Sequence, residues 1–175
     1  MKIHEYQAKE ILKNYDVPVP IGYVTTKLGE VKDLVKKFPD QIVGVKDSTY
    51  NLYEKLNLEN FSVFPGSELK LLKGLELGCS GIITATCNVT AQLARRVYDD
   101  FFSGKVQLYN QKLIDVRNEF EKYNLISALH TFYKKKDSIY ENLLPPLRVL
   151  DPKSEKELIK NLERLNFSIK SLMAA

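Results

Sequence analysis

The sequence has few cysteines and histidines, and this scarcity limits the kinds of site that it can build. Its 175 residues include two of each. Neither Cys79 nor Cys87 has Cys or His companions at the spacing of zinc ligands, which excludes a zinc site of that kind. We predict that both thiols are free and reduced, because small buried side chains are the usual role of such cysteines. His130, in an apolar helical pattern, is interpreted as a packed residue rather than a ligand.

Long apolar runs and a strong excess of one charge are also absent. No run approaches the roughly 20 residues of a membrane span, and Met1 to Tyr6 forms a charged helix start rather than a secretory signal. The net charge is +4. Lysines alternate with Glu and Asp along the predicted helices, which favours solvated helix faces over a nucleic-acid surface. We therefore expect a cytoplasmic protein that binds neither nucleic acid nor membrane.

What the sequence does contain is a series of short apolar segments, each followed by polar residues. The predicted strands are Ile42 to Ser48, Ser62 to Gly66 and Gly81 to Thr86. An amphipathic helix, Ser67 to Leu77, lies between the second and the third. Short apolar runs that alternate with helical patterns are typical of buried parallel strands in βα units. In such folds the chemistry sits at the carboxyl ends of the strands, and Lys46 is at one of these ends.

Helical periodicity accounts for most of the remaining chain. The predicted helices are His4 to Asn14, Glu30 to Phe38, Val89 to Ser103, Val106 to Tyr123, Leu125 to Lys135 and a last helix from Pro152 onward. Asn88 is expected to cap the helix that follows it, and Ser154 and Glu157 stand at capping-box spacing. Ile21 to Thr26 is a candidate strand. The predicted fold class is α/β.

Four motifs in register carry a resemblance to one enzyme family. They read Val43-Gly44-Val45-Lys46-Asp47-Ser48, Phe64-Pro65-Gly66-Ser67-Glu68, Gly81-Ile82-Ile83-Thr84-Ala85-Thr86-Cys87-Asn88 and Leu144-Pro145-Pro146-Leu147. In order and spacing they resemble the dihydrodipicolinate synthase and N-acetylneuraminate lyase family, over about residues 39–172. The resemblance implies a partial (β/α)8 TIM barrel, made of strands 6 to 8 with their helices and followed by C-terminal helices.

The same resemblance implies a catalytic lysine and a set of substrate-binding residues. The family's sixth strand carries a lysine that forms a Schiff base with a 2-oxo acid such as pyruvate, and Lys46 matches it. Ser48 matches a neighbouring hydroxyl position, and Gly66 and Glu68 match the loop after the seventh strand. Thr84 is the candidate on the third predicted strand. No metal or organic cofactor is expected, because the imine itself serves as the electron sink.

Each of these residues also has a plainer structural interpretation. A Schiff base needs a neutral amine, which burial favours, so Lys46 is expected to be shielded from water inside the barrel; otherwise it is a strand-edge lysine that reaches solvent. Ser48 can simply begin a turn, and Gly66 can be a turn glycine. Glu68 can be an acid in the first turn of a helix, where the dipole favours it.

The opening of the chain resembles a different protein. The motifs His4-Glu5-Tyr6-Gln7-Ala8-Lys9-Glu10-Ile11-Leu12, Tyr15, Val17-Pro18-Val19-Pro20 and Gly22-Tyr23 are similar to the start of the β subunit of succinyl-CoA ligase (ADP-forming), an ATP-grasp protein. We therefore predict two segments, residues 1–38, a helix-strand-helix segment foreign to the barrel, and 39–175, joined between Thr26 and Pro39. Either two gene ends were fused, which we favour, or the opening drifted. The ligase's nucleotide loop and metal carboxylates have no counterpart after residue 40.

Parts of the lyase family's pattern are missing as well. Its carboxylate-binding Thr-Thr pair and its proton-shuttling tyrosine precede the lysine strand by a long stretch that this chain lacks. Three parallel strands also leave an open edge. We expect the chain to be inactive alone, or to form a homo-oligomer or pair with another chain through that edge. The alternatives are a ligase remnant that binds nucleotide and a non-catalytic half-barrel that pairs with another chain.

Overall fold

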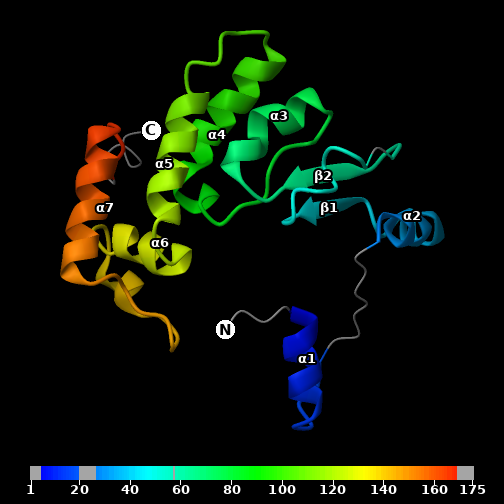
Figure 1. Ribbon diagram of the computed structural model, residues 1–175, viewed down its shortest axis with the longest axis horizontal. Coiled ribbons are helices and arrows are strands. Elements are labelled where there is room, and N and C mark those ends of the chain that lie inside the picture. Colours follow the sequence, from blue (N-terminus) through cyan, green and yellow to red (C-terminus); the bar gives the residue numbers. More distant parts are fainter. Residues whose placement is uncertain (1–4, 20–26, 57, 169–175) are drawn as a thin grey trace. The chain divides into compact units, whose positions relative to one another are not determined.

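The computed structural model describes residues 5–19, 27–56 and 58–168, and it divides the chain into two compact units. Unit 1 is Met1–Val43 and unit 2 is Gly44–Ala175. Figure 1 labels the helices and strands of both units. The candidate strand at Ile21 to Thr26 lies outside the described residues.

Unit 1 contains two helices and has no core of its own among its described residues. They are α1 (Glu5–Lys13) and α2 (Leu28–Lys37), within two residues of the predicted ends. The apolar side chains Ile11 and Leu12 of α1 are exposed. None of the described residues of unit 1 whose exposure is known is buried. The apolar faces of these helices are therefore not buried within their own unit.

Unit 2 begins with a parallel two-stranded sheet, as the sequence predicts. Strand β1 (Gly44–Asp47) pairs with β2 (Ser62–Pro65), with Gly44 opposite Ser62 and Lys46 opposite Phe64. A Cβ atom added at Gly44 would lie 2.7 Å from the backbone oxygen of Ser62. Glycine is therefore required for the strands to pack this closely at that position.

The third predicted strand, Gly81 to Thr86, is wrong as a regular strand. The segment does follow β2, because the Ser80 N–H donates to the Val63 carbonyl at 3.1 Å and the Ile83 N–H donates to the Pro65 carbonyl at 3.2 Å. No β-ladder forms, however, and the chain turns directly into the next helix. Two backbone hydrogen bonds join the segment to β2, and among the described residues no strand pairs with its other side.

The remainder of unit 2 is helical. Its elements are η1 (Glu68–Lys70), α3 (Leu71–Glu76), α4 (Cys87–Phe102), α5 (Asn110–Glu121), α6 (Leu125–Tyr133), η2 (Ser138–Glu141) and α7 (Pro152–Arg164). The predicted helix from Ser67 is thus a 3-10 turn followed by a short α-helix. No helix among the described residues has both the length and the apolar character needed to cross a membrane.

Both predicted helix caps are wrong. Asn88 lies inside α4, and its side-chain amide donates to the Ala85 carbonyl at 2.8 Å instead of accepting from a backbone N–H. Helix α7 is capped one turn before the predicted capping box, by Asp151. One carboxylate oxygen of Asp151 accepts the backbone N–H groups of Lys153 and Ser154.

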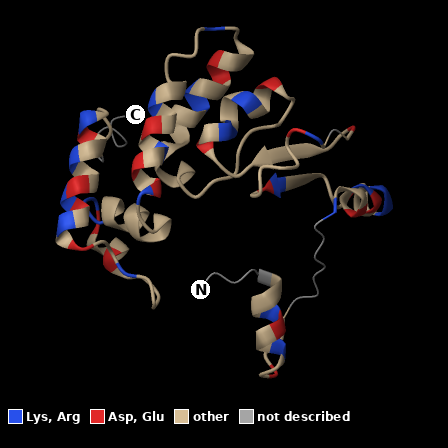
Figure 2. Ribbon diagram, in the orientation of Figure 1, with Lys and Arg blue, Asp and Glu red and all other residues tan. Residues whose placement is uncertain are grey.

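Helix α5 joins two hydrophobic clusters, because it lies between α4 and α7 (Figure 1). One cluster connects α4, α5, α6 and α7; its largest fully buried side chains are Val89, Val116, Phe120, Phe132, Leu158 and Leu162. The other connects α3, α4 and α5; its buried residues are Leu71, Leu75, Ala94, Val97 and Leu113. Charges of both signs alternate along α7 on the outside (Figure 2).

Candidate active site

Lys46 lies in β1 opposite Phe64, one residue before the end of the strand. Because strand side chains alternate, these two share one face of the sheet, and Asp47 and Pro65 share the other. Asp47 and Pro65 are buried, whereas Lys46 is exposed. The expectation that Lys46 is shielded from water is therefore wrong for this chain. The physical reason is the size of the sheet. Two strands and one adjoining segment form an open layer rather than a closed barrel, so water reaches the face that carries Lys46.

Asp47, which sequence reasoning missed, organises the loop directly after Lys46. One of its carboxylate oxygens accepts the N–H groups of Thr49 and Tyr50 at 3.1 and 2.9 Å, and also the Thr49 hydroxyl at 3.0 Å. The other accepts the N–H groups of Leu52 and Tyr53, both at 2.9 Å. The signal in the sequence was an Asp just before Ser and Thr, a pattern that favours side-chain turns of this kind.

The hydrogen bonds to Asp47 determine its ionisation. Burial raises the pKa of this carboxyl, but hydrogen bonds from Tyr53, Leu52 and Thr49 favour the charged form, and together they hold the pKa below its ordinary value. Asp47 is therefore a buried anion at neutral pH, one residue from Lys46. Its contacts hold the loop rather than the lysine amine.

Ser48 and Gly66 lie where the two strands end. Ser48 is exposed. The Gly66 N–H donates to the Asp47 carbonyl at 2.9 Å, and a Cβ atom at Gly66 would lie 3.3 Å from that same carbonyl oxygen. The backbone of Gly66 thus lies close to the neighbouring strand. Contact of Ser48 or Gly66 with a substrate remains a prediction.

Glu68 and Thr84 belong to one buried polar cluster. Glu68 is 0% exposed, and its carboxylate accepts the hydroxyls of Thr84 at 3.0 Å and Thr90 at 2.8 Å. The Thr84 hydroxyl also lies 3.0 Å from the Thr86 hydroxyl. Both oxygens of Glu68 are thus engaged inside unit 2, and contact of this carboxylate with a substrate remains a prediction.

Arg117 on α5, which sequence reasoning also missed, supplies the positive charge of this cluster. Its Nη1 donates to the Thr86 hydroxyl at 2.6 Å and lies 3.7 Å from Glu68 Oε2, and its Nη2 donates to Glu121 at 3.0 Å. Arg117 is 6% exposed, and its Nε has no hydrogen-bond partner. Neither local pattern nor helical periodicity pointed to this residue, because the pairing joins η1 to a helix much later in the chain.

The cysteines and histidines of the described residues form no site. Cys79 and Cys87 are free, as predicted. Burial raises the pKa of the Cys79 thiol, and burial together with the charge of Glu68 raises that of Cys87 to about 11, so neither is a thiolate at neutral pH. Among the described residues no group of His, Cys, Asp and Glu could hold a metal ion. His130 lies 2.8 Å from the Tyr140 carbonyl and packs against its ring.

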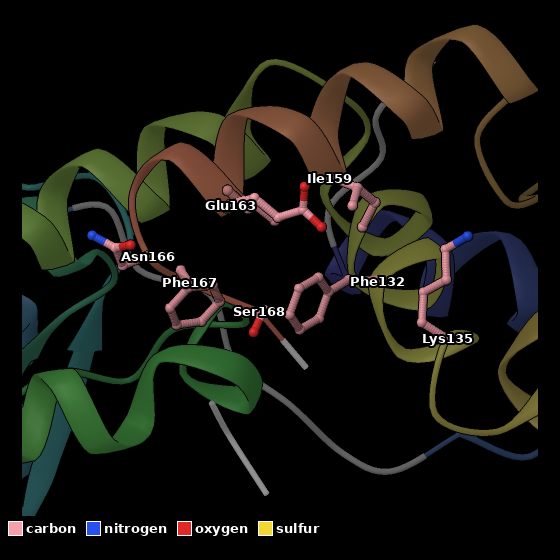
Figure 3. Close-up of a pocket in the computed structure, with 8 residues that line it drawn as sticks. Phe132, Lys135, Ile159, Glu163, Asn166, Phe167 and Ser168 are labelled. Atoms are coloured by element: carbon pink, nitrogen blue, oxygen red, sulfur yellow. The ribbon is translucent and has the colours of Figure 1, made fainter. Parts of the chain in front are cut away.

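A cavity lies elsewhere in unit 2, between α6, α7 and the residues that follow α7. Its volume is about 650 Å³. Figure 3 shows the stacked rings of Phe132 and Phe167 facing it, with Lys135 and Glu163 at its sides. None of the five predicted site residues lines this cavity.

The sequence matches one enzyme family over most of its length. The profile of the dihydrodipicolinate synthetase family matches residues 9–165. The 2-dehydro-3-deoxy-D-gluconate/2-dehydro-3-deoxy-phosphogluconate aldolase of Picrophilus torridus is 29% identical over 152 residues, covering 79% of this chain and 56% of that enzyme. The resemblance to the ligase is also confirmed: over 46 residues, 26% of this chain and 12% of the subunit, the chain is 48% identical to the succinate–CoA ligase (ADP-forming) β subunit of Rickettsia massiliae.

Solved structures agree on the fold. Dihydrodipicolinate synthase of Agrobacterium tumefaciens superposes with a TM-score of 0.64 at 22% identity, over 81% of this chain and 50% of that one. A prophage protein of the same family from Escherichia coli K12, crystallised with pyruvate, gives 0.65 at 19% identity, over 95% and 63%. The chain therefore spans about half the length of the relatives that it matches.

These likenesses identify the sheet and helices of unit 2 as part of an α/β barrel. The family profile begins at residue 9, inside the segment predicted to be foreign, so the boundary between residues 38 and 39 stays a prediction. The units of the structure divide between Val43 and Gly44. Because the profile covers well over half of the sequence, this chain belongs to the dihydrodipicolinate synthetase family.

Proposed function

We propose that this chain is the carboxyl-terminal half of a Schiff-base lyase that acts on pyruvate or a related 2-oxo acid, with Lys46 as the imine-forming residue. The observation that carries the proposal is the position of Lys46, at the carboxyl end of a parallel strand within the region that matches the family. In α/β barrels the reacting groups stand at these strand ends. The family relative from Escherichia coli, whose crystal contains pyruvate, supports a 2-oxo acid as the ligand.

In the proposed chemistry the lysine nitrogen is the protein atom that bonds covalently to the substrate. The neutral amine attacks the keto carbon, one proton is taken up from solvent, the keto oxygen leaves as water, and a positively charged imine forms. The neighbouring carbon then loses a proton to solvent, and the electron pair of that C–H bond is delocalised toward the imine. This carbon next forms a bond to an aldehyde; in the reverse direction that carbon–carbon bond breaks and the aldehyde leaves. No metal or organic cofactor takes part in these steps. A cytoplasmic location also stays a prediction.

The isolated chain is proposed to be inactive. Lys46 is exposed to water, whereas the proposed reaction takes place on an amine enclosed within the barrel. Glu68 is held by Thr84, Thr90 and Arg117, so it would have to exchange some of these contacts to bind a substrate. The chain also spans only about half of its relatives, and the rest of their barrel would have to enclose the lysine.

A single-chain chimera tests the role of Lys46. The first half of the Picrophilus torridus aldolase, ending before the residue aligned with Gly44, is fused to residues 44–175 of this chain. We expect pyruvate and borohydride to label Lys46 in the folded chimera, as measured by peptide mass spectrometry, and Lys46→Arg to remove the label. Lys70→Arg, a change in η1, is the matched control and should leave labelling intact. A chimera that unfolds cooperatively yet is not labelled at Lys46 contradicts the proposal.

The ligase resemblance supports a second candidate, a nucleotide-binding remnant. It rests on 46 residues that correspond to 12% of the ligase subunit. We expect ATP with magnesium to leave the melting temperature of the full chain unchanged, because the ligase's nucleotide loop and metal carboxylates have no counterpart here. A rise in melting temperature with ATP, but not with pyruvate, would favour the hypothesis that the chain is a nucleotide-binding remnant of the ligase.

A further inference from the structure

We propose that the open side of the β1–β2 sheet binds a separate polypeptide carrying the first five strands of a barrel of the same family, so that the barrel is completed from two chains. This inference rests on the proposed function, since the partner would enclose Lys46. The partner would contact the outer edge of β1 and the exposed face of the sheet.

The outer edge of β1 presents unpaired backbone groups. The Asp47 carbonyl accepts from Gly66, so the polar backbone groups of Asp47, and by alternation those of Val45, point toward β2. Those of Gly44 and Lys46 therefore point away from β2. Among the described residues, no backbone hydrogen bond reaches these outward groups. A row of free donors and acceptors is a template for an added strand.

One face of the same sheet is bare. Asp47, Val63 and Pro65 are buried on the helix-covered face. On the opposite face Lys46 is exposed and Phe64 is half-buried. In the segment beside β2, Ile82 packs against the helix cluster, and its neighbour Ile83, which by alternation points the other way, is 46% exposed. In the closed barrel of the family fold, side chains from opposite strands fill the space over such a face. The bare face thus has the apolar surface that a closed barrel would cover.

The number of strands selects the partner. A TIM barrel has eight parallel strands, and the described part of unit 2 supplies two strands and one strand-like segment. Two copies of the described part of this chain would supply at most six strand segments, too few to close that barrel. A polypeptide with the first five strands supplies the remainder. This chain covers 50% of the synthase of Agrobacterium tumefaciens, so half of that protein lies outside the match.

The test mixes the full chain with a purified first half of the Picrophilus torridus aldolase, ending before the residue aligned with Gly44. Size-exclusion chromatography with light scattering should give the mass of a one-to-one complex. Residue-resolved amide exchange should slow at least about tenfold at the outward N–H of Lys46, as expected for a newly paired strand. The N–H of Val45, which already faces β2, is the internal control and should change less.

Variants localise the surface. Ile83→Glu places a charge on the bare face and should weaken the complex about tenfold or more, because an unpaired charge is costly to bury. Leu108→Glu changes an apolar residue that is 75% exposed in the turn between α4 and α5, and it should leave the affinity unchanged. Lys46→Arg should bind as the wild type does, because the contact at this residue is made by its backbone.

The outcomes separate this inference from the proposed function. If neither this first half nor the corresponding half of the Agrobacterium tumefaciens synthase forms a complex, or if the chain pairs only with itself, the inference is overturned. If the complex forms but Lys46 takes no pyruvate label in the chimera, the surface stands and the proposed function fails. If the chimera is labelled but the separate chains do not associate, the function stands and this inference fails.

Discussion

At the scale of single residues, Asp47 has a larger structural role than its neighbour Lys46. Its carboxylate holds the N–H groups of Thr49, Tyr50, Leu52 and Tyr53. We expect Asp47→Ala to lower the free energy of unfolding by at least about 2 kcal/mol, because hydrogen bonds to a charged group contribute about 1.5–3 kcal/mol each and are not additive. Urea denaturation measures the loss.

The control for this change is Asp99→Ala. Asp99 forms an exposed ion pair with Arg95 on α4, and such pairs contribute about 0–1 kcal/mol. Equal losses from the two substitutions would show that the loop after β1 does not depend on the Asp47 carboxylate.

The same carboxylate makes stability depend on pH. The folded state holds the pKa of Asp47 below the ordinary value of 3.8. Its contribution is therefore complete above that value and is lost as the pH falls through the lower, folded-state pKa. Urea midpoints measured between neutral pH and pH about 2 should fall more steeply for the wild type than for Asp47→Asn. Parallel curves would contradict this assignment.

Arg117 is the second residue on which the fold depends. Removing one partner of a buried ion pair leaves an uncompensated charge, which costs about 3–5 kcal/mol. We expect Arg117→Leu to destabilise the protein by about that amount in urea denaturation, since Glu68 would remain buried without its cation. Arg95→Leu, at an exposed arginine, is the control. A double substitution of Glu68 and Arg117 that costs the sum of the single changes would show that the two do not interact.

The sequence allowed these residues to be found only in part. Lys46 and Gly66 were placed at strand ends, because apolar runs and glycine punctuation are local signals. The structural role of Asp47 depends on the chain folding back over it. The role of Glu68 depends on Arg117, a partner that no spacing in the sequence connects to it. The environment of a polar side chain was thus the part that could not be predicted.

At the scale of elements, the cap of α7 provides a direct comparison between sequence and structure. Asp151 accepts two backbone N–H groups and the Ser154 hydroxyl, whereas the sequence pattern favoured Ser154 as the cap. We expect Asp151→Ala to cost about 1 kcal/mol in thermal or urea unfolding, the usual loss for an N-cap. Ser154→Ala should cost less. A larger loss of stability from Ser154→Ala than from Asp151→Ala would indicate that Ser154 is the cap after all.

Helices were predicted better than strands. Apolar residues at helical spacing predicted the bounds of α4, α5 and α6 to within a few residues at most helix ends. The segment at Gly81 to Thr86 has the composition of a strand but does not form a regular one, because a strand needs pairing partners that composition does not report. Pairing is a property of the neighbouring segments rather than of the segment itself.

At the scale of the whole molecule, all the buried residues of the described chain lie in unit 2. We therefore expect residues 44–175 alone to unfold cooperatively, with a urea midpoint close to that of the full chain. Far-ultraviolet circular dichroism during urea denaturation measures this midpoint. A truncated chain that aggregates or loses cooperativity would instead show that unit 1 covers part of unit 2.

The buried cluster of Glu68, Thr84 and Arg117 has an evolutionary consequence. These residues fasten η1 to α4 and α5, so selection for folding alone would retain them in a descendant that had stopped turning over substrate. The motif that ends in Glu68 thus has a role in folding, and its presence alone does not establish catalysis. A genome survey that inferred aldolase activity from this motif alone would therefore also count family members that have lost the activity.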